Sequence, residues 1–116
     1  MGAIRYFKHI CTNFINGYAI KKNGITIGNN STFNGIVTFI CDQPNSITIG
    51  DSFRVNSGKN YNSIGGDNRC IISTIHDGTI SIGDNVGISN STIIAMDNVI
   101  IENDVRIGGS CKFYDN

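Results

Sequence analysis

The stretch Ile80–Ser89, read ISIGDNVGIS, contains a short pattern that recurs along the chain. An apolar residue, any residue and a second apolar residue are followed by glycine, two polar residues and a further apolar residue. Closely similar phrases occur at 25–33 (ITIGNNSTF), 47–55 (ITIGDSFRV) and 99–107 (VIIENDVRI). Such self-similarity is typical of repeat architectures, whose units bury their apolar faces against one another. The sequence therefore predicts a repeat protein.

The phase of the repeat indicates what each unit builds. Apolar and polar residues alternate with the period of a β-strand, and the Gly-Asn or Gly-Asp pairs between them tolerate the backbone of a sharp corner. Each second apolar residue has an apolar partner six places on, such as Ile82 and Ile88. We expect the corners to contain Asp51, Asp84 and Asn103. We expect nearly full burial of Ile27, Ile49, Ile82, Ile88, Ile101 and Ile107.

Three six-residue faces make one coil, and stacked coils share one continuous core. The residues Ile27, Ile49, Ile82 and Ile101 are spaced by 22, 33 and 19 residues, so each gap fits one coil with an excursion of variable length. The fold class predicted for residues 23–116 is all-β, a parallel β-helix of about four or five coils. This solenoid is expected to be incomplete at its C-terminal end.

Residues 1–22 do not follow this rhythm and are predicted to cap the first coil. Apolar residues spaced by three and four predict a helix that ends near Phe14 or Ile15, with its apolar face toward the column. The residues of this face are Phe7, Ile10, Cys11, Phe14 and Tyr18. The alternative is a membrane-surface or partner-binding helix that uses Arg5, Lys8 and the aromatic residues.

Composition excludes several classes of function. Nine Lys and Arg balance nine Asp and Glu, which gives no net field toward nucleic acid or an anionic surface. No apolar run is long enough to span a bilayer and no secretory signal is recognisable, so we expect a cytoplasmic protein. The four cysteines, Cys11, Cys41, Cys70 and Cys111, lack metal-ligand spacing and are expected to be free thiols, with no metal bound.

Residues 80–116, ISIGDNVGISNSTIIAMDNVIIENDVRIGGSCKFYDN, resemble the hexapeptide-repeat acyltransferases. Within that family the resemblance is to sugar O-acetyltransferases related to galactoside, maltose and capsular-polysaccharide enzymes, and it covers roughly residues 23–116. It implies left-handed coils, a homotrimer with active sites between neighbouring columns, and acetyl-CoA as the acyl donor. The acceptor would be a sugar hydroxyl, in a process such as polysaccharide biosynthesis.

The resemblance also implies a histidine that acts as general base on the sugar hydroxyl. In relatives this histidine follows a phrase like IGGSCKFYDN, so its position is expected just beyond Asn116 and no catalytic residue is assigned within the chain. The chain would then be the N-terminal part of an acetyltransferase. Its last coil is expected to continue into further coils, supplied by a second polypeptide or by association of identical chains. Asn90 and Asp97 correspond to residues that contact the acceptor sugar.

Other candidate residues are less well placed. His9 falls in the cap, and His76, beside Asp77 at a predicted corner, does not match the position of the family's base. The loop at 56–70 contains Lys59, Tyr61 and Arg69, which suit contact with a sugar or a coenzyme phosphate.

Two other classes share this kind of coil. A γ-class carbonic anhydrase needs several histidine ligands for zinc, which the two widely separated histidines do not supply. A non-catalytic structural or interaction solenoid stays open. Rows of threonine or flat repeated faces would favour it.

Overall fold

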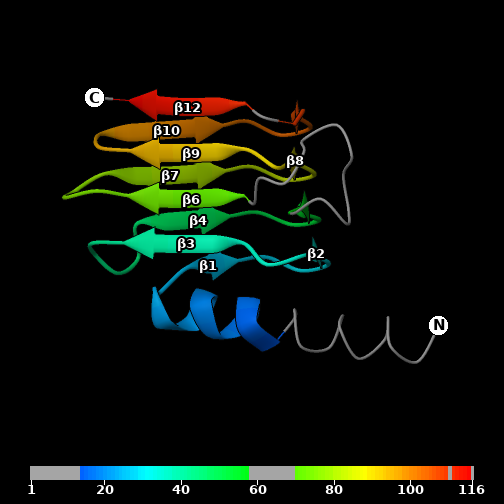
Figure 1. The fold of residues 1–116 in the computed structure, drawn as a ribbon, viewed down its shortest axis with the longest axis horizontal. Coiled ribbons are helices and arrows are strands. Elements are labelled where there is room, and N and C mark those ends of the chain that lie inside the picture. Colours follow the sequence, from blue (N-terminus) through cyan, green and yellow to red (C-terminus); the bar gives the residue numbers. More distant parts are fainter. Residues whose placement is uncertain (1–13, 58–69, 110, 116) are drawn as a thin grey trace.

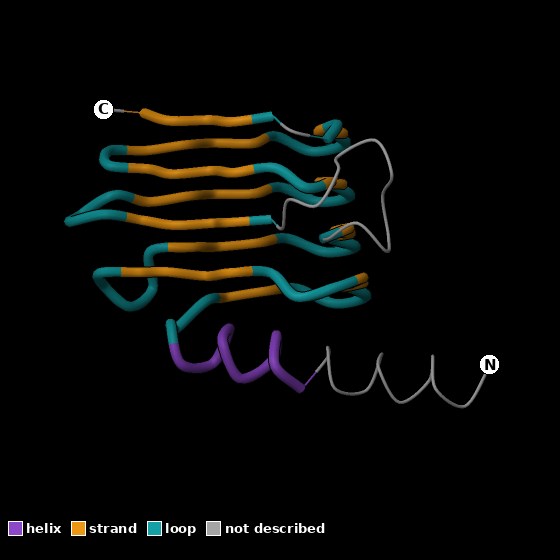
Figure 2. Tube along the Cα trace, in the orientation of Figure 1, coloured by secondary structure: helices purple, strands orange, loops and turns teal. Residues whose placement is uncertain are grey.

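The protein is described by a computed structural model that covers residues 14–57, 70–109 and 111–115. These residues form twelve short strands in three parallel sheets, preceded by one short helix (Figure 1). The chain visits the three sheets in turn and then returns to the first, so four coils stack into a column (Figure 2). The repeat pattern predicted this all-β parallel coil correctly.

Each coil contributes one strand to each sheet, and each sheet has four strands. Sheet 1 contains β1 (Thr26–Ile27), β4 (Ile47–Ile49), β7 (Thr79–Ile82) and β10 (Asn98–Ile101). Sheet 2 contains β2 (Thr32–Asn34), β5 (Arg54–Asn56), β8 (Gly87–Ser89) and β11 (Arg106–Ile107). Sheet 3 contains β3 (Thr38–Cys41), β6 (Ile71–Thr74), β9 (Thr92–Ala95) and β12 (Lys112–Asp115). We call the turn from sheet 1 to sheet 2 the first corner, from sheet 2 to sheet 3 the second, and from sheet 3 back to sheet 1 the third.

The strand register reproduces the spacing of the repeat. Ile27 pairs with Ile49, Ile49 with Ile82, and Ile82 with Ile101. The register holds because a slip of one residue would turn every inward side chain outward.

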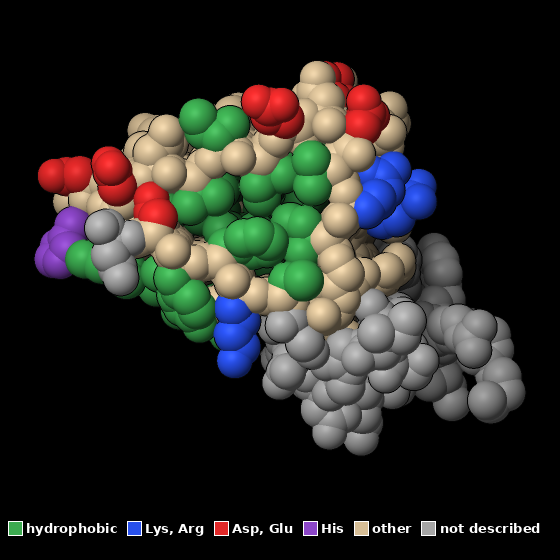
Figure 3. Space-filling model, turned by 90° about the horizontal axis from the view of Figure 1, so that it is seen from above, with side chains coloured by type: hydrophobic (Ala, Val, Ile, Leu, Met, Phe, Trp, Pro, Cys, Tyr) green, Lys and Arg blue, Asp and Glu red, His purple; other side chains and the backbone are tan. Residues whose placement is uncertain are grey.

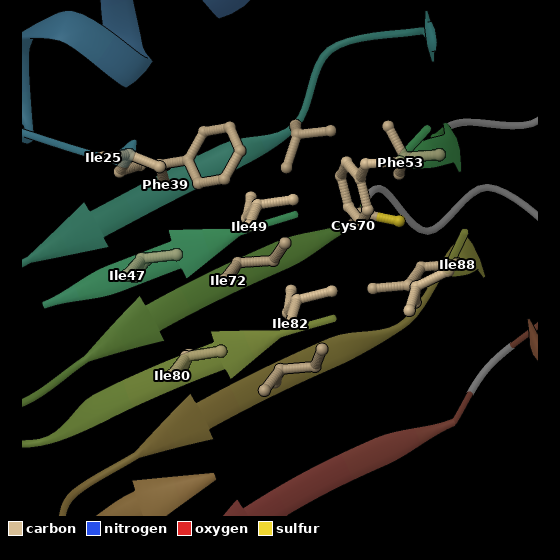
Figure 4. Close-up of a cluster of buried hydrophobic side chains, with 14 of the residues drawn as sticks. Ile25, Phe39, Ile47, Ile49, Phe53, Cys70, Ile72, Ile80, Ile82 and Ile88 are labelled. Carbon is tan, nitrogen blue, oxygen red and sulfur yellow. The ribbon is translucent and has the colours of Figure 1, made fainter. Parts of the chain in front are cut away.

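Inward side chains from all three sheets fill the column, and those of the middle coils are buried completely or nearly so (Figure 4). The predicted burial of Ile49, Ile82, Ile88 and Ile107 is confirmed, with exposed fractions of 2%, 3%, 1% and 8%. It is wrong for Ile27 and Ile101, which are only partly buried. Both lie on a terminal coil, which has a neighbouring coil on one side only.

The first corner interlocks from coil to coil. The N–H of Asn29 donates to Asp51 Oδ1 over 2.8 Å, that of Asp51 to Asp84 Oδ1 over 2.8 Å, and that of Asp84 to Asn103 Oδ1 over 2.7 Å. The corner position predicted for Asp51, Asp84 and Asn103 is therefore confirmed. In each of the four coils the next residue of this corner has a left-handed backbone; these residues are Asn30, Ser52, Asn85 and Asp104.

The glycine of each repeat makes room for this interlock. A Cβ on Gly28 would lie 2.0 Å from Asp51 Oδ1 of the next coil. A Cβ on Gly50 would lie 2.2 Å from Asp84 Oδ1, and a Cβ on Gly83 would lie 2.2 Å from Asn103 Oδ1. These glycines are needed for close approach between coils rather than for an unusual backbone angle. The fourth coil has Glu102 at this position, and no described coil lies above it.

The helix spans residues 14–22 and lies across the end of the column beside β1 (Figure 1). The predicted helix end near Phe14 or Ile15 is wrong, because the helix continues to residue 22. Gly24, two residues later, has a φ of 65°, which is typical of the residue that follows a helix C-terminus. The predicted packing face is also wrong for Phe14 and Tyr18, which point to solvent. Ala19 and Ile20 pack on the core instead.

Asn16 fixes the helix to the first coil. Its side chain is buried, donates through Nδ2 to the carbonyl of Gly35 over 2.9 Å and accepts from the N–H of Val37 over 3.0 Å. These two contacts satisfy backbone groups that would otherwise be left unpaired at the outer edge of the coil.

Candidate functional site

The two residues predicted to contact a sugar lie at opposite ends of β9. Asn90 forms the second corner with a left-handed backbone (φ 41°), is 1% exposed, and donates its N–H to the carbonyl of Asn56 over 2.9 Å. Asp97 lies at the third corner and its side chain is exposed. The four-residue strand β9, about 13 Å long, lies between them, so one column does not bring them together. Their role in sugar binding stays a prediction.

The third corner brings His76 and Asp97 to the same side of the column, one coil apart. The N–H of Thr79 donates to the carbonyl of Asp97 over 2.8 Å, which joins the two corners. Gly78 makes this approach possible, since a Cβ there would lie 2.1 Å from the carbonyl oxygen of Ala95.

His76 has a left-handed backbone (φ 56°), and its N–H donates to Asp42 Oδ2 over 2.8 Å. Its imidazole and the neighbouring Asp77 carboxylate are both exposed. Within the described part of the chain no carboxylate forms an ion pair with the imidazole. Among the described residues, His76 therefore has no orienting partner of the kind that a general base of the triad type requires.

Asp115, at the end of β12, closes the third corner from above. Its Oδ1 accepts from the N–H of Met96 over 2.7 Å, and its Oδ2 accepts from the N–H of Asn98 over 2.6 Å. Desolvation raises the pKa of the Asp115 carboxyl, but N–H groups of Met96, Asn98 and Asp97 outweigh it, so the pKa lies below its ordinary value. Neighbouring backbone N–H groups that point toward one place form an anion-binding turn, and here the bound anion is the Asp115 carboxylate of the same chain.

A shallow depression of about 420 Å³ lies over the third and fourth coils at the outer face of sheet 1 and the first corner. Ile100, 63% exposed, provides its apolar surface, and the side chains of Ser81 and Glu102 are also exposed there. The depression is lined by Ser81, Ile82, Gly83, Ile100, Ile101, Glu102 and Asn103. No sequence pattern predicts this depression, because it arises from side chains that lie next to one another only after two coils have stacked.

The end of the column at the fourth coil is an apolar surface. Seen from that end, hydrophobic side chains occupy its centre and charged side chains surround them (Figure 3). Phe113 is 41% exposed, while Val99, Ile101, Val105 and Cys111 are only partly buried. β10, β11 and β12 are the outer strands of their sheets, so their edges are open to further pairing.

Cys41, Cys70 and Cys111 are free thiols, as predicted, and Cys11 lies outside the described residues. Burial raises the pKa of the Cys70 thiol, against the opposing effect of hydrogen bonds with Ser91, Asn90 and Ser57. A protonated, buried thiol is a poor nucleophile. Among residues 14–57, 70–109 and 111–115 no group of three potential metal ligands occurs.

Several predicted candidates, namely His9, Lys59, Tyr61 and Arg69, lie outside the described residues. No helix of the described chain is both long and apolar enough to cross a membrane. No protein-family model, no curated protein and no solved structure matches the chain.

Proposed function

We propose that the column is the N-terminal part of an acetyl-CoA-dependent sugar O-acetyltransferase of the hexapeptide-repeat type, with left-handed coils. The observation that carries the proposal is the six-residue phase of the repeat, with its Ile-Gly-Asx corners stacked in register at Ile27, Ile49 and Ile82. The cytoplasmic enzyme would act as a trimer on a sugar acceptor, for example in polysaccharide biosynthesis. Further coils would stack on β10, β11 and β12.

In this reaction a general base removes the proton of a sugar hydroxyl, whose oxygen attacks the thioester carbonyl of acetyl-CoA. The acetyl C–S bond breaks, an ester C–O bond forms, and the proton passes to the departing thiolate of coenzyme A. Asp97 is exposed at the third corner and accepts a hydrogen bond from the sugar there. Asn90 shapes the other end of the same strand.

Sugar binding tests the role of Asp97. Saturation-transfer NMR with galactosides and maltose should detect binding that Asp97→Ala removes. Asp77→Ala is the matched control, because Asp77 is also exposed at the third corner, one coil below. Binding that survives Asp97→Ala unchanged, or no binding of either sugar, would contradict the proposed site.

Acetyl transfer tests the location of the base. Neither His9 nor His76 occupies the position of the family's histidine, so the 116-residue chain alone should transfer no acetyl group to these sugars above background. Robust transfer that His76→Ala abolishes would place the base at the third corner instead.

A second candidate is a non-catalytic interaction solenoid. Thr26, Thr48 and Ser81 pair in register along the outer face of sheet 1, and all three are exposed. Exposed hydroxyl groups in register on three neighbouring strands favour binding to an extended, regular partner. Loss of partner binding in Thr48→Val, with no sugar binding by the wild-type chain, would favour this function over acetyl transfer.

A further inference from the structure

The helix at residues 14–22 presents an apolar strip to solvent. Phe14 is 77% exposed, Tyr18 64% and Ile15 44%, although the opposite side of the helix is fixed to the column. Lys21 and Lys22 follow in the next turn and are also exposed. Residues at i, i+4, i+7 and i+8 lie on one helix face, so the aromatic and basic side chains form one continuous strip.

The N-terminal part of the sequence is also positively charged, and the rest is negatively charged. Residues 1–41 contain four Lys and Arg and no Asp or Glu, while residues 42–116 contain five Lys and Arg and nine Asp and Glu. The balanced net charge conceals this separation. At the far end of the column, acidic side chains line part of the rim and Lys or Arg side chains line other parts (Figure 3). Within the described helix, the exposed Lys21 and Lys22 provide positive charge that attracts a negative surface.

We propose that the face formed by Phe14, Ile15, Tyr18, Lys21 and Lys22 binds the surface of an anionic lipid bilayer. Aromatic rings suit the boundary between headgroups and acyl chains, and lysines suit anionic headgroups. A nucleic acid would match the lysines but leave the exposed Phe14 and Ile15 without a partner. In this orientation the helix lies in the membrane surface, and the open fourth coil is at the end away from it (Figure 1).

Membrane binding goes beyond the proposed acetyl transfer and does not depend on it. The test is co-sedimentation of the full chain with vesicles of phosphatidylcholine containing 30% phosphatidylglycerol, compared with vesicles of phosphatidylcholine alone. The wild-type chain should pellet with the anionic vesicles. Phe14→Ser with Tyr18→Ser should weaken binding at least about tenfold, because binding scales with the apolar area inserted. Lys21→Gln with Lys22→Gln should weaken it about 25-fold at low salt, at about fivefold per lysine.

Tyr114→Ser is the matched control. Tyr114 is 58% exposed, close to the 64% of Tyr18, but lies on β12 at the opposite end of the column. It should leave binding unchanged, and circular dichroism should show all variants folded. Failure of the wild-type chain to pellet, or equal loss in Tyr114→Ser, would overturn the proposal. So would light scattering in which the wild-type chain is an oligomer that Phe14→Ser with Tyr18→Ser disperses, since the strip would then bind a second copy.

Discussion

The two ends of the column differ in how far their apolar core is covered. At the first coil the helix covers part of the core, and the Asn16 side chain pairs with backbone groups of Gly35 and Val37. At the fourth coil no described residue covers the core, and Phe113 is 41% exposed. Stacking of coils therefore buries the middle of a solenoid, whereas each end needs a separate structure to cover it.

Removal of a core side chain should destabilise the middle of the column more than its open end. Ile82→Ala should lower the free energy of unfolding by about 2–5 kcal/mol, because it leaves a cavity between two coils. Ile101→Ala, at the equivalent position of the fourth coil, should cost less than about 2 kcal/mol, because its side chain already contacts water. Urea unfolding of both variants provides the measurement. Equal losses would show that the fourth coil is covered in solution.

The covered end depends on a polar side chain. Asn16→Ala should destabilise the protein by about 2 kcal/mol, since it leaves the buried N–H of Val37 and the carbonyl of Gly35 without partners. Hydrogen exchange at the Val37 amide should accelerate more than exchange in β7.

Gly17→Ala on the same helix is the control for Asn16→Ala. No atom lies within 4 Å of a Cβ at Gly17, so alanine should stabilise the helix by about 0.5–1 kcal/mol. If both variants destabilise equally, the helix is sensitive to any change and Asn16 has no special role.

The sequence predicted the column well because its signals are local. Two-residue alternation marks the strands, and Ile-Gly-Asx marks the first corner at Gly50 and Gly83. It did not predict the orientation of the helix, because spacing by three and four identifies an apolar face without saying what that face contacts. Phe14 and Tyr18 fit the pattern of a packing face, yet the contact to the first coil is made by Asn16, Ala19 and Ile20.

The candidate site was predicted less well for a physical reason. Residues of one corner come from different coils, so their neighbours depend on how many residues each excursion contains. Asp97 and His76 are 21 residues apart in sequence and both lie at the third corner, one coil apart, whereas Asn90, only seven residues from Asp97, lies at another corner. Proximity in sequence is a poor guide to proximity around a coil.

Substitutions at the first corner, where the coils interlock, should have smaller effects on stability and should differ between the third and fourth coils. Gly83→Ala places a Cβ 2.2 Å from Asn103 Oδ1, which must move and lose its bond to the Asp84 N–H, at a cost of about 1–3 kcal/mol. Glu102→Ala is the matched change one coil above and should stay within about 0.5 kcal/mol, since no described coil covers it. Thermal unfolding measures both. A cost at Glu102 as large as that at Gly83 would mean that another group packs over the fourth coil.

The smallest effect is confined to the open end and depends on pH. Hydrogen bonds from Met96, Asn98 and Asp97 place the pKa of Asp115 below its ordinary value despite desolvation, so the folded carboxyl holds its proton less tightly than the unfolded one. The contribution of Asp115 to stability is therefore present above the unfolded pKa, near 3.8, and is lost as pH falls through the folded pKa. Protection factors at the amides of Met96 and Asn98 should fall below about pH 4, while those in β4 and β7 stay unchanged. Asp115→Asn keeps one acceptor oxygen but cannot titrate, so protection at these amides should become independent of pH in this range. A pH dependence that persists in Asp115→Asn would show that another group holds the last strand in place.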